Sequence, residues 1–342
     1  MARSKSDISS TPATRSAGPW RSAWQHVRKD RVAMGSLVVL ILIVAACVAA
    51  PLYANNIAHV DAFASNVQGT YTLNGVTGPV LVNSTEGLGL GVTPIGPTWN
   101  FSTYFLGADN QGRDVFARIL YGGRNSLLIG FVSAVLCCML AGLVGVVAGY
   151  FGKGVDAVLS RALDVLWAFP VYLLAICLSV VLINTTLTIG PWTLTSGSLL
   201  LPILIIGIIY VPYVARPIRG QVMSLREREF VQAAVGAGAK DSRLLRRELL
   251  PNVLPTLIVF LPLMTAINML TESALSFLSI GVQPPDASWG TIINDGVGLL
   301  YTRPMVAIAP GIILAITAVA LNLLGDGVRD ALDPKARLRG SL

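Results

Sequence analysis

Few residues in this chain have the type and spacing needed for covalent or metal chemistry. The two histidines, His26 and His59, lie far apart along the 342 residues. The cysteines, none at the loop spacing of a disulfide framework or a zinc site, all lie in apolar runs: Cys47, Cys137, Cys138 and Cys177. These patterns argue against a histidine-based metal centre and against Ser-His-Asp catalysis. We therefore expect no catalytic residue, no metal site and no cofactor bound by this chain.

A polar stripe lies inside an otherwise apolar segment. Asn268, Glu272 and Ser276 recur at every fourth residue and so share one face of a helix. A charged side chain at the centre of a membrane span costs about 2.5–3.5 kcal/mol on insertion scales, which makes such residues candidates for function. The stripe therefore either lines a polar pathway or its gate, or is a buried hydrogen-bonding stripe that holds helices together.

A second candidate is an ion pair. Arg161 and Asp164 lie about one helical turn apart, near one end of another apolar segment. We expect them to pair with each other or with the charged loop at 216–248, and to have a structural role.

These residues must be positioned by membrane helices. The chain is 54% hydrophobic and only 13% charged, with a mean hydropathy of +0.67, whereas soluble domains carry about 25% charged residues. A helix needs about 20 apolar residues to cross the bilayer. The apolar runs predict six spans, near 32–53, 125–152, 249–271 and 304–325, with two more inside 165–215. Pro170 and Pro202 predict kinks.

Basic residues predict the orientation of these helices. There are 25 Lys and Arg against 18 Asp and Glu. In the predicted topology four of the basic residues lie on one side of the membrane: Arg113, Arg118, Arg124 and Arg303. All the other Lys and Arg residues lie on the side of both termini. Because cytoplasmic loops carry the excess of Lys and Arg, both termini are expected in the cytoplasm. The net charge of +7 is thereby explained without nucleic acid.

The chain divides into membrane and flanking parts. We expect a cytoplasmic N-terminal arm with an interfacial helix at 1–31, a first span at 32–53 and an extracytoplasmic segment at 54–120. A transmembrane core at 121–326, with a cytoplasmic loop at 216–251, and a cytoplasmic tail at 327–342 complete it.

The extracytoplasmic segment contains two local signals. Asn74-Gly75 between two β-prone runs predicts a hairpin, with an irregular loop as the alternative. Residues 113–121, which alternate charged and apolar residues, predict a separate interfacial helix.

The largest cytoplasmic loop reads as a helix, a glycine turn and a second helix. Phe230, Ala233, Ala234 and Ala237 share one helical face, and Gly236 and Gly238 interrupt the helix. Asp241 is expected to cap the second helix, which Pro251 is expected to close as it starts the next span. The small-residue face favours close approach of a partner protein. The alternative is a basic amphipathic hairpin lying on anionic lipid.

This loop resembles the EAA loop of binding-protein-dependent ABC importer permeases. The matching residues are Gln232-Ala233-Ala234, Gly238 and Leu250-Pro251-Asn252. Further stretches resemble the C-type permease of dipeptide and oligopeptide importers: LGADNQGRDV, YGGRNSL, AGYFG, DVLWAFP, ESALSFLSIGVQPPDASWG and NLLGDGVRDALDP. The resemblance covers about residues 20–342. The chain departs from the family at Gln232, where Glu is usual, at Ala108, where Thr is usual, and in a longer segment at 55–105.

The resemblance implies an all-α polytopic membrane protein with a type I ABC importer permease fold, in the bacterial cytoplasmic membrane. It implies four kinds of partner: a second, B-type permease, two cytoplasmic ATPases that bind ATP and Mg, an extracytoplasmic substrate-binding protein and membrane lipid. It also implies that the loop couples the ATPase to this chain through Phe230, Gln232, Ala233, Ala234, Gly238, Leu250 and Pro251. The chain has no phosphate loop of its own.

Three functions follow from these features. The first is a permease subunit that imports di- or oligopeptides by alternating access, driven by ATP hydrolysis in partner subunits. The second is ABC import of nickel or another small solute. The third is an autonomous secondary transporter, which would need coupling-ion sites; Glu272 is the one carboxylate well inside a span.

Overall fold

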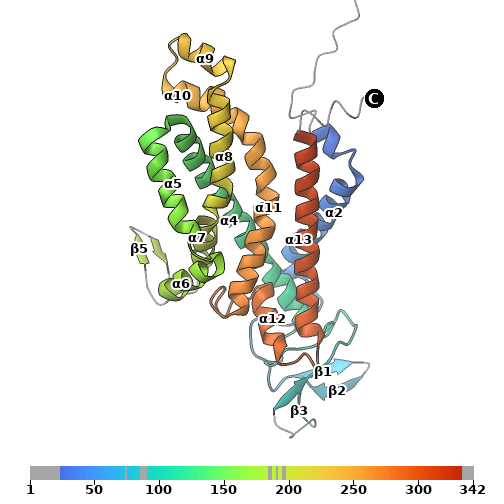
Figure 1. Ribbon diagram of the computed structural model, residues 1–342. Coiled ribbons are helices and arrows are strands. Elements are labelled where there is room, and N and C mark those ends of the chain that lie inside the picture. Colours follow the sequence, from blue (N-terminus) through green and yellow to red (C-terminus); the bar gives the residue numbers. More distant parts are fainter. Residues whose placement is uncertain are drawn as a thin grey trace, which may run out of the picture.

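The computed structural model describes most of the chain as a bundle of long helices with small strands at one end (Figure 1). The described residues are 24–73, 75–84, 91–183, 187–189, 192–194 and 198–332. Four helices are long and apolar enough to cross a membrane, and the number rises to six if each of two bent helix pairs is one span. This agrees with the predicted six-span, all-α membrane architecture.

The helices are, in chain order, α2 (Arg31–Val48), α3 (Ala50–Asn56), α4 (Val115–Phe151), α5 (Lys153–Trp167), α6 (Val171–Ile183), α7 (Leu200–Ile209), α8 (Val211–Arg226), α9 (Glu229–Gly236), α10 (Asp241–Arg243), the π-helix η1 (Leu244–Leu249), α11 (Leu250–Phe277), α12 (Trp289–Val297) and α13 (Met305–Leu332). The strands are β1 (Thr70–Leu73), β2 (Val76–Pro79), β3 (Leu81–Asn83), β4 (Val92–Pro94), β5 (Leu187–Ile189) and β6 (Trp192–Leu194).

The first span is α2, which begins one residue before the predicted start. The Asp30 carboxylate caps it by accepting from the Val32 backbone N–H at 2.8 Å. The predicted continuation to residue 53 is interrupted at Ala49, and α3 then starts with Pro51 in its first turn, where a missing N–H costs little. The predicted interfacial helix is seen only as a short helical stretch at 24–27. Residues 1–23 of the predicted arm lie outside the described chain.

Helix α4 is continuous from Val115 to Phe151, about 55 Å at 1.5 Å per residue. The prediction of a separate interfacial helix at 113–121 was therefore wrong. Asp114 caps α4 by accepting from the Ala117 backbone N–H at 2.8 Å. Val115, Ala117 and Ile119 are fully buried against neighbouring elements, so the helix has packing partners from its first turn.

Two of the expected spans are bent. Helices α5 and α6 meet at 86°, and Pro170 lies in the break between them, as its predicted kink requires. The kink predicted at Pro202 is absent, because Pro202 lies in the first turn of α7, where no backbone donor is lost. The second bend, of 42°, lies at Tyr210 between α7 and α8.

Helix α4 packs against α8 and α11, while α13 packs against α11 and α2. Glycines allow the α4–α8 approach. A Cβ on Gly145 would lie 2.8 Å from the Ala215 carbonyl oxygen, and one on Gly149 would lie 2.8 Å from the Arg219 carbonyl oxygen. This is the small-xxx-small arrangement that brings membrane helices together.

The predicted hairpin is present. Strands β1 and β2 pair antiparallel, with Leu73 opposite Val76, and Gly75 has a φ of +81°, whereas Asn74 lies outside the described residues. Strands β3 and β4 form a second antiparallel pair. Strands β1–β3 lie beside α12 at one end of the bundle, whereas α9, α10 and the C-terminal end of α13 lie at the other (Figure 1).

Candidate functional site

The coupling surface, which we define as α9 with the turn to α10, projects beyond the end of the bundle (Figure 1). Within α9 only Val231 is buried, at 1% exposure. Phe230 and Val235 are apolar yet 41% and 51% exposed, and Gln232 and Ala233 are exposed as well. Phe230 and Ala233 share one face of α9, and this face is open to contact by a partner protein.

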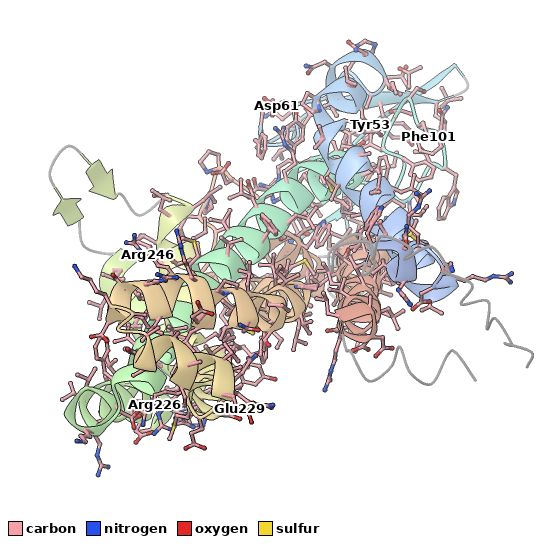
Figure 2. The ribbon with its side chains drawn as sticks, turned by 90° about the horizontal axis from the view of Figure 1, so that it is seen from above. Tyr53, Asp61, Phe101, Arg226, Glu229 and Arg246 are labelled. Atoms are coloured by element: carbon pink, nitrogen blue, oxygen red, sulfur yellow. The ribbon has the colours of Figure 1, made fainter. Side chains whose placement is uncertain are left out.

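Seen from the α9 end, the charged side chains of this region lie on one side of the molecule. Arg226, Glu229 and Arg246 are carried by α8, α9 and η1, away from Tyr53 and Phe101 (Figure 2). All three charged residues are exposed. The polar side chains are therefore available to solvent or to a partner at this end.

Two hydrogen bonds connect α9 to α8 and α8 to α4. The Gln232 amide Nε2 donates to the Arg226 carbonyl at 3.0 Å, which satisfies a group at the end of α8. The Arg226 guanidinium in turn donates to the Tyr150 carbonyl at 2.9 Å, at the end of α4. A glutamate at position 232 has no proton to donate at neutral pH, so the departure from the family motif has a structural role here.

The turn between the two loop helices is at Gly238, which has a φ of +75°. The helix–turn–helix prediction is thus confirmed, but the predicted N-cap is wrong. Asp241 is the first residue of α10, Lys240 is its N-cap, and no side chain makes a capping bond there. The Asp241 carboxylate instead accepts from the Tyr150 hydroxyl at 2.6 Å, so it ties the loop to α4.

The second loop helix does not end at Pro251. It runs through η1 into α11, and Leu250 and Pro251 lie in the first turn of α11, so Pro251 does start the next span as predicted. A proline cannot donate a backbone hydrogen bond to the preceding turn, and the turn that precedes Pro251, at 244–249, is π-helical. Leu250 is 41% exposed. The loop is therefore continuous with a membrane helix.

The predicted Arg161–Asp164 pair is replaced by the alternative contact. The Asp164 carboxylate accepts from the Arg216 guanidinium at 2.9 Å, and Arg216 also lies over the Trp167 ring. Asp164 faces α8 rather than its own helix neighbour, because α5 packs along α8. A second contact of the same kind joins Asp156 and Arg219, with Nη2 2.6 Å from Oδ2.

The polar stripe on α11 is completely buried. Asn268, Glu272 and Ser276 are each 0% exposed. The Glu272 carboxylate accepts from the Ser276 hydroxyl at 2.6 Å and from the Ser126 hydroxyl of α4 at 2.9 Å. The Asn268 amide lies 2.9 Å from the Ser133 hydroxyl of α4.

Two further bonds extend this network beyond α11 and α4. The Trp289 backbone N–H donates to the Ser126 hydroxyl at 3.1 Å, and the Val282 N–H donates to the Ser276 hydroxyl at 3.0 Å. These contacts support the alternative, a hydrogen-bonding stripe that joins α11, α4 and α12, and the assignment of Asn268, Glu272 and Ser276 to a pathway or its gate stays a prediction.

Sequence reasoning missed an ion network at the opposite end. The Asp109 carboxylate, 0% exposed, pairs with Arg118 and, at 2.8 Å, with Arg113. Asp295 of α12 pairs with Arg118 at 2.8 Å and with Arg113 at 3.1 Å. The signal was the alternation of acidic and basic residues within 109–118, although the partner Asp295 lies far away in sequence. The network fixes the start of α4 to α12.

The sequence matches the family described as binding-protein-dependent transport system inner membrane component over residues 141–338. Residues 18–66 match the N-terminal TM domain of oligopeptide transport permease C.

Curated proteins of two bacteria resemble nearly the whole chain. The dipeptide transport system permease protein DppC of Alkalihalophilus pseudofirmus is 32% identical over 93% of this chain and 91% of its own length. The oligopeptide transport system permease protein OppC of Bacillus subtilis is 32% identical over 93% of this chain and 90% of its own.

A solved structure shares the fold. It is an inward-facing conformation of the MetNI methionine ABC transporter, with a TM-score of 0.51 and 19% identity, over 63% of this chain and 96% of that chain.

Proposed function

Because this chain belongs to the family of binding-protein-dependent transport system inner membrane components, we propose that it is the C-type permease subunit of an ATP-driven importer of di- and oligopeptides. The motif resemblance in the sequence is confirmed by the family match and by relatives named as dipeptide and oligopeptide permeases. The proposed cargo, di- and oligopeptides, is inferred from the names of those relatives. The chain is a membrane-embedded transport subunit that works with other ABC subunits.

The exposed coupling surface carries the proposal. A single buried side chain, Val231, anchors α9, while Phe230 and Val235 face outward. So little burial leaves this element weakly stabilised on its own, and docking on a partner would cover its apolar residues. We assign Phe230, Gln232, Ala233, Ala234, Gly238, Leu250 and Pro251 to coupling with a cytoplasmic ATPase.

The proposed transport cycle follows from the continuity of this loop with membrane helices. Closure of two partner ATPases on ATP and Mg would move α9. Because α9 contacts α8 and η1, and η1 continues into α11, the movement passes to helices that pack against α4. The bundle then alternates between inward and outward access, and this chain itself binds no cofactor. A B-type permease and an extracytoplasmic binding protein complete the proposed complex.

The proposed location is the bacterial cytoplasmic membrane, with both termini in the cytoplasm. The ends of α13 and α9 lie at the same end of the bundle (Figure 1), and the exposed basic residues Arg226, Arg243 and Arg246 lie in this region. That placement supports the orientation inferred from the positive-inside rule. Contact with membrane lipid follows, and nucleic acid is not a proposed partner.

The proposal is tested by purifying the chain through a C-terminal tag from gently solubilised native membranes. We expect a second permease and two phosphate-loop ATPases to co-purify, and the reconstituted complex to take up a dipeptide only when ATP and its binding protein are present. Uptake by this chain alone would overturn the proposal in favour of a secondary transporter. Uptake of nickel without peptide would retain the ABC assignment and replace the cargo.

A further inference from the structure

A polar cavity of about 600 Å³ lies at the end of the bundle opposite α9, between the start of α4 and the segment that leads into α12. One wall carries Gln111, Arg113 and Arg118, and the other carries Asp286 and Asn294. The volume is within the range of small-molecule sites, about 300–1,000 Å³. The cavity extends to Ser276, whose hydroxyl donates to Glu272, so it adjoins the buried stripe of α11.

One side of the cavity offers an unused hydrogen-bond donor. Arg118 is 3% exposed, and one of its terminal nitrogens binds both Asp109 and Asp295. Its Nε is buried and has no hydrogen-bond partner among the described residues. A buried donor without an acceptor costs about 1–3 kcal/mol. A carbonyl or carboxylate oxygen of a ligand in the cavity would satisfy it.

The other side offers an unused acceptor. Asp286 is half-buried at the cavity and makes no hydrogen bond or ion pair with any residue that the structure describes. Pro284, Pro285 and Phe63 add apolar surface beside it. A free carboxylate here favours a cationic group, and an ammonium can donate up to three hydrogen bonds to such acceptors.

We propose that this cavity receives the free amino end of a peptide, with the α-ammonium at Asp286 and the following carbonyl or carboxylate at Arg118. The inference rests on the proposed function and extends it to a substrate contact in this chain. A divalent cation fits poorly because Arg113 and Arg118 share the lining, and a simple anion fits poorly because Asp286 and Asp295 do. A zwitterionic peptide end matches both charges of the cavity.

The test uses the complex purified through this chain and a dipeptide with a free amino end and a photoreactive benzoylphenylalanine as its second residue. After irradiation, mass spectrometry locates the cross-links. We expect them within 109–118 and 276–295, suppressed by excess Ala-Ala but not by N-acetyl-Ala-Ala. Asp286→Asn should reduce this labelling about tenfold at subsaturating probe, as expected for loss of a charge-assisted bond, and Asp286→Glu should restore most of it.

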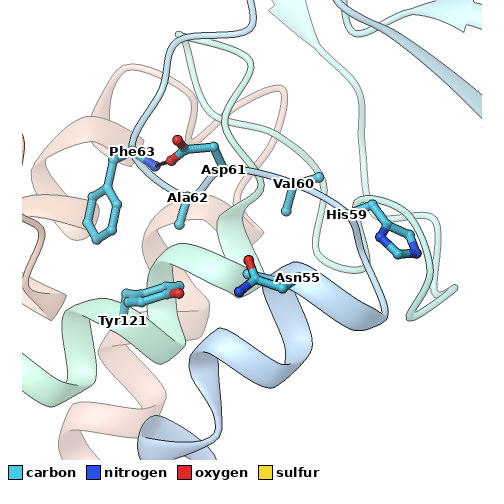
Figure 3. A pocket seen from close by; sticks show the side chains of 8 residues that line it. Asn55, His59, Val60, Asp61, Ala62, Phe63 and Tyr121 are labelled. Carbon is cyan, nitrogen blue, oxygen red and sulfur yellow. Dashed lines mark hydrogen bonds between the residues drawn. The ribbon is translucent and has the colours of Figure 1, made fainter.

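The matched control is Asp61→Asn. Asp61 lines a neighbouring cavity with His59 and Tyr121 (Figure 3), and Phe63 lies in the lining of both cavities. The Asp61 carboxylate accepts from the Phe63 backbone N–H at 2.8 Å (Figure 3), a bond that asparagine retains. The same loss of charge should therefore leave labelling unchanged.

Three outcomes overturn the inference: no cross-link at the cavity, equal suppression by the acetylated dipeptide, or full labelling of Asp286→Asn. These are distinguishable from failure of the proposed function by an uptake assay on the same wild-type complex. Peptide uptake without cavity labelling rejects the inference alone. Absence of peptide uptake with ATP and the binding protein present rejects the proposed function.

Discussion

Asp114 shows how one carboxyl group serves two opposed requirements. Its Oδ1 caps α4 through the Ala117 N–H, while its Oδ2 is buried without a partner among the described residues. Burial raises the pKa of Asp114 from 3.8 to about 6, and nearby Asp109 adds to the rise. The cap needs an acceptor oxygen, but the site disfavours the charge.

We therefore expect Asp114→Asn to stabilise the protein at pH 7–8. Because the pKa is higher in the folded state, the folded protein binds more protons than the unfolded chain between about pH 4 and 6. Wild-type stability should fall as the pH rises through that interval, by up to about 3 kcal/mol, and stay low above it. Asparagine keeps the capping oxygen and carries no charge, so the variant should lose this dependence. Thermal unfolding in detergent from pH 4.5 to 8 measures the difference.

The control for Asp114 is Asp30→Asn, which replaces the cap of α2. Asp30 has the same bond to the backbone, to Val32 N–H at 2.8 Å, but it is only half-buried. Its variant should keep the wild-type pH dependence. An Asp114→Asn protein that unfolds at lower temperature than wild type at pH 8 would show that the charge stabilises the site.

At the scale of the element, local patterns predicted helices and turns well. The apolar runs predicted the spans, and Asn74-Gly75 predicted the hairpin that β1 and β2 form. Where a distant element decides the outcome, the sequence left two partners open for Asp164 and missed the network around Asp109. Asp164 forms an ion pair with Arg216 of α8, and Asp109 and Asp295 of α12 both pair with Arg118. Neither contact can be derived from helical spacing alone.

Two glycine-to-alanine substitutions, one in α4 and one in α8, are expected to change the stability of the protein in opposite directions. Gly145→Ala should lower the unfolding temperature, because its Cβ would lie 2.8 Å from the Ala215 carbonyl oxygen and from Ile218. Gly220→Ala, in α8, meets nothing within 4 Å and should be neutral or stabilising, by up to about 1 kcal/mol. Thermal unfolding of the two purified variants compares them directly. Equal effects would argue that the close contact at Gly145 is easily relaxed.

The loop turn predicts a variant that separates coupling from folding. A Cβ at Gly238 meets nothing within 4 Å, so the Gly238→Asp chain should insert in the membrane with only the local backbone penalty of a positive φ, about 1–2 kcal/mol. Its new charge lies on the coupling surface, so peptide uptake should be abolished. Membrane content and uptake are measured in the same cells.

Gly154→Asp is the matched control, since Gly154 at the start of α5 also has open space around it and lies off the coupling surface. It should retain uptake. If Gly238→Asp transported normally, the assignment of this turn to coupling would fail, whereas loss of uptake in both variants would point to charge at this end of the bundle as the cause.

At the scale of the whole molecule, the two ends of the bundle differ in construction. The α9 end carries an exposed coupling surface with little burial of its own, whereas the opposite end is fixed by the Asp109–Arg118–Asp295 network. Trp289 adds to this fixation by donating from Nε1 to the Ile119 carbonyl at 3.0 Å. Low burial at the α9 end and the ion network at the other suit the proposed coupling, in which a partner moves the bundle from the α9 end.

The proposed orientation predicts that two introduced cysteines, at positions 76 and 237, are accessible to reagents from opposite sides of the membrane. Val76, 71% exposed in β2, and Ala237, exposed at the end of α9, lie at opposite ends (Figure 1). In a Cys177→Ser background, which removes the one native cysteine that is exposed, Val76→Cys should react with an impermeant maleimide on intact spheroplasts. Ala237→Cys should react only after permeabilisation. The reverse pattern would place both termini outside the cell, where α9 could not meet an ATPase, so this labelling also tests the premise on which the coupling assignment depends.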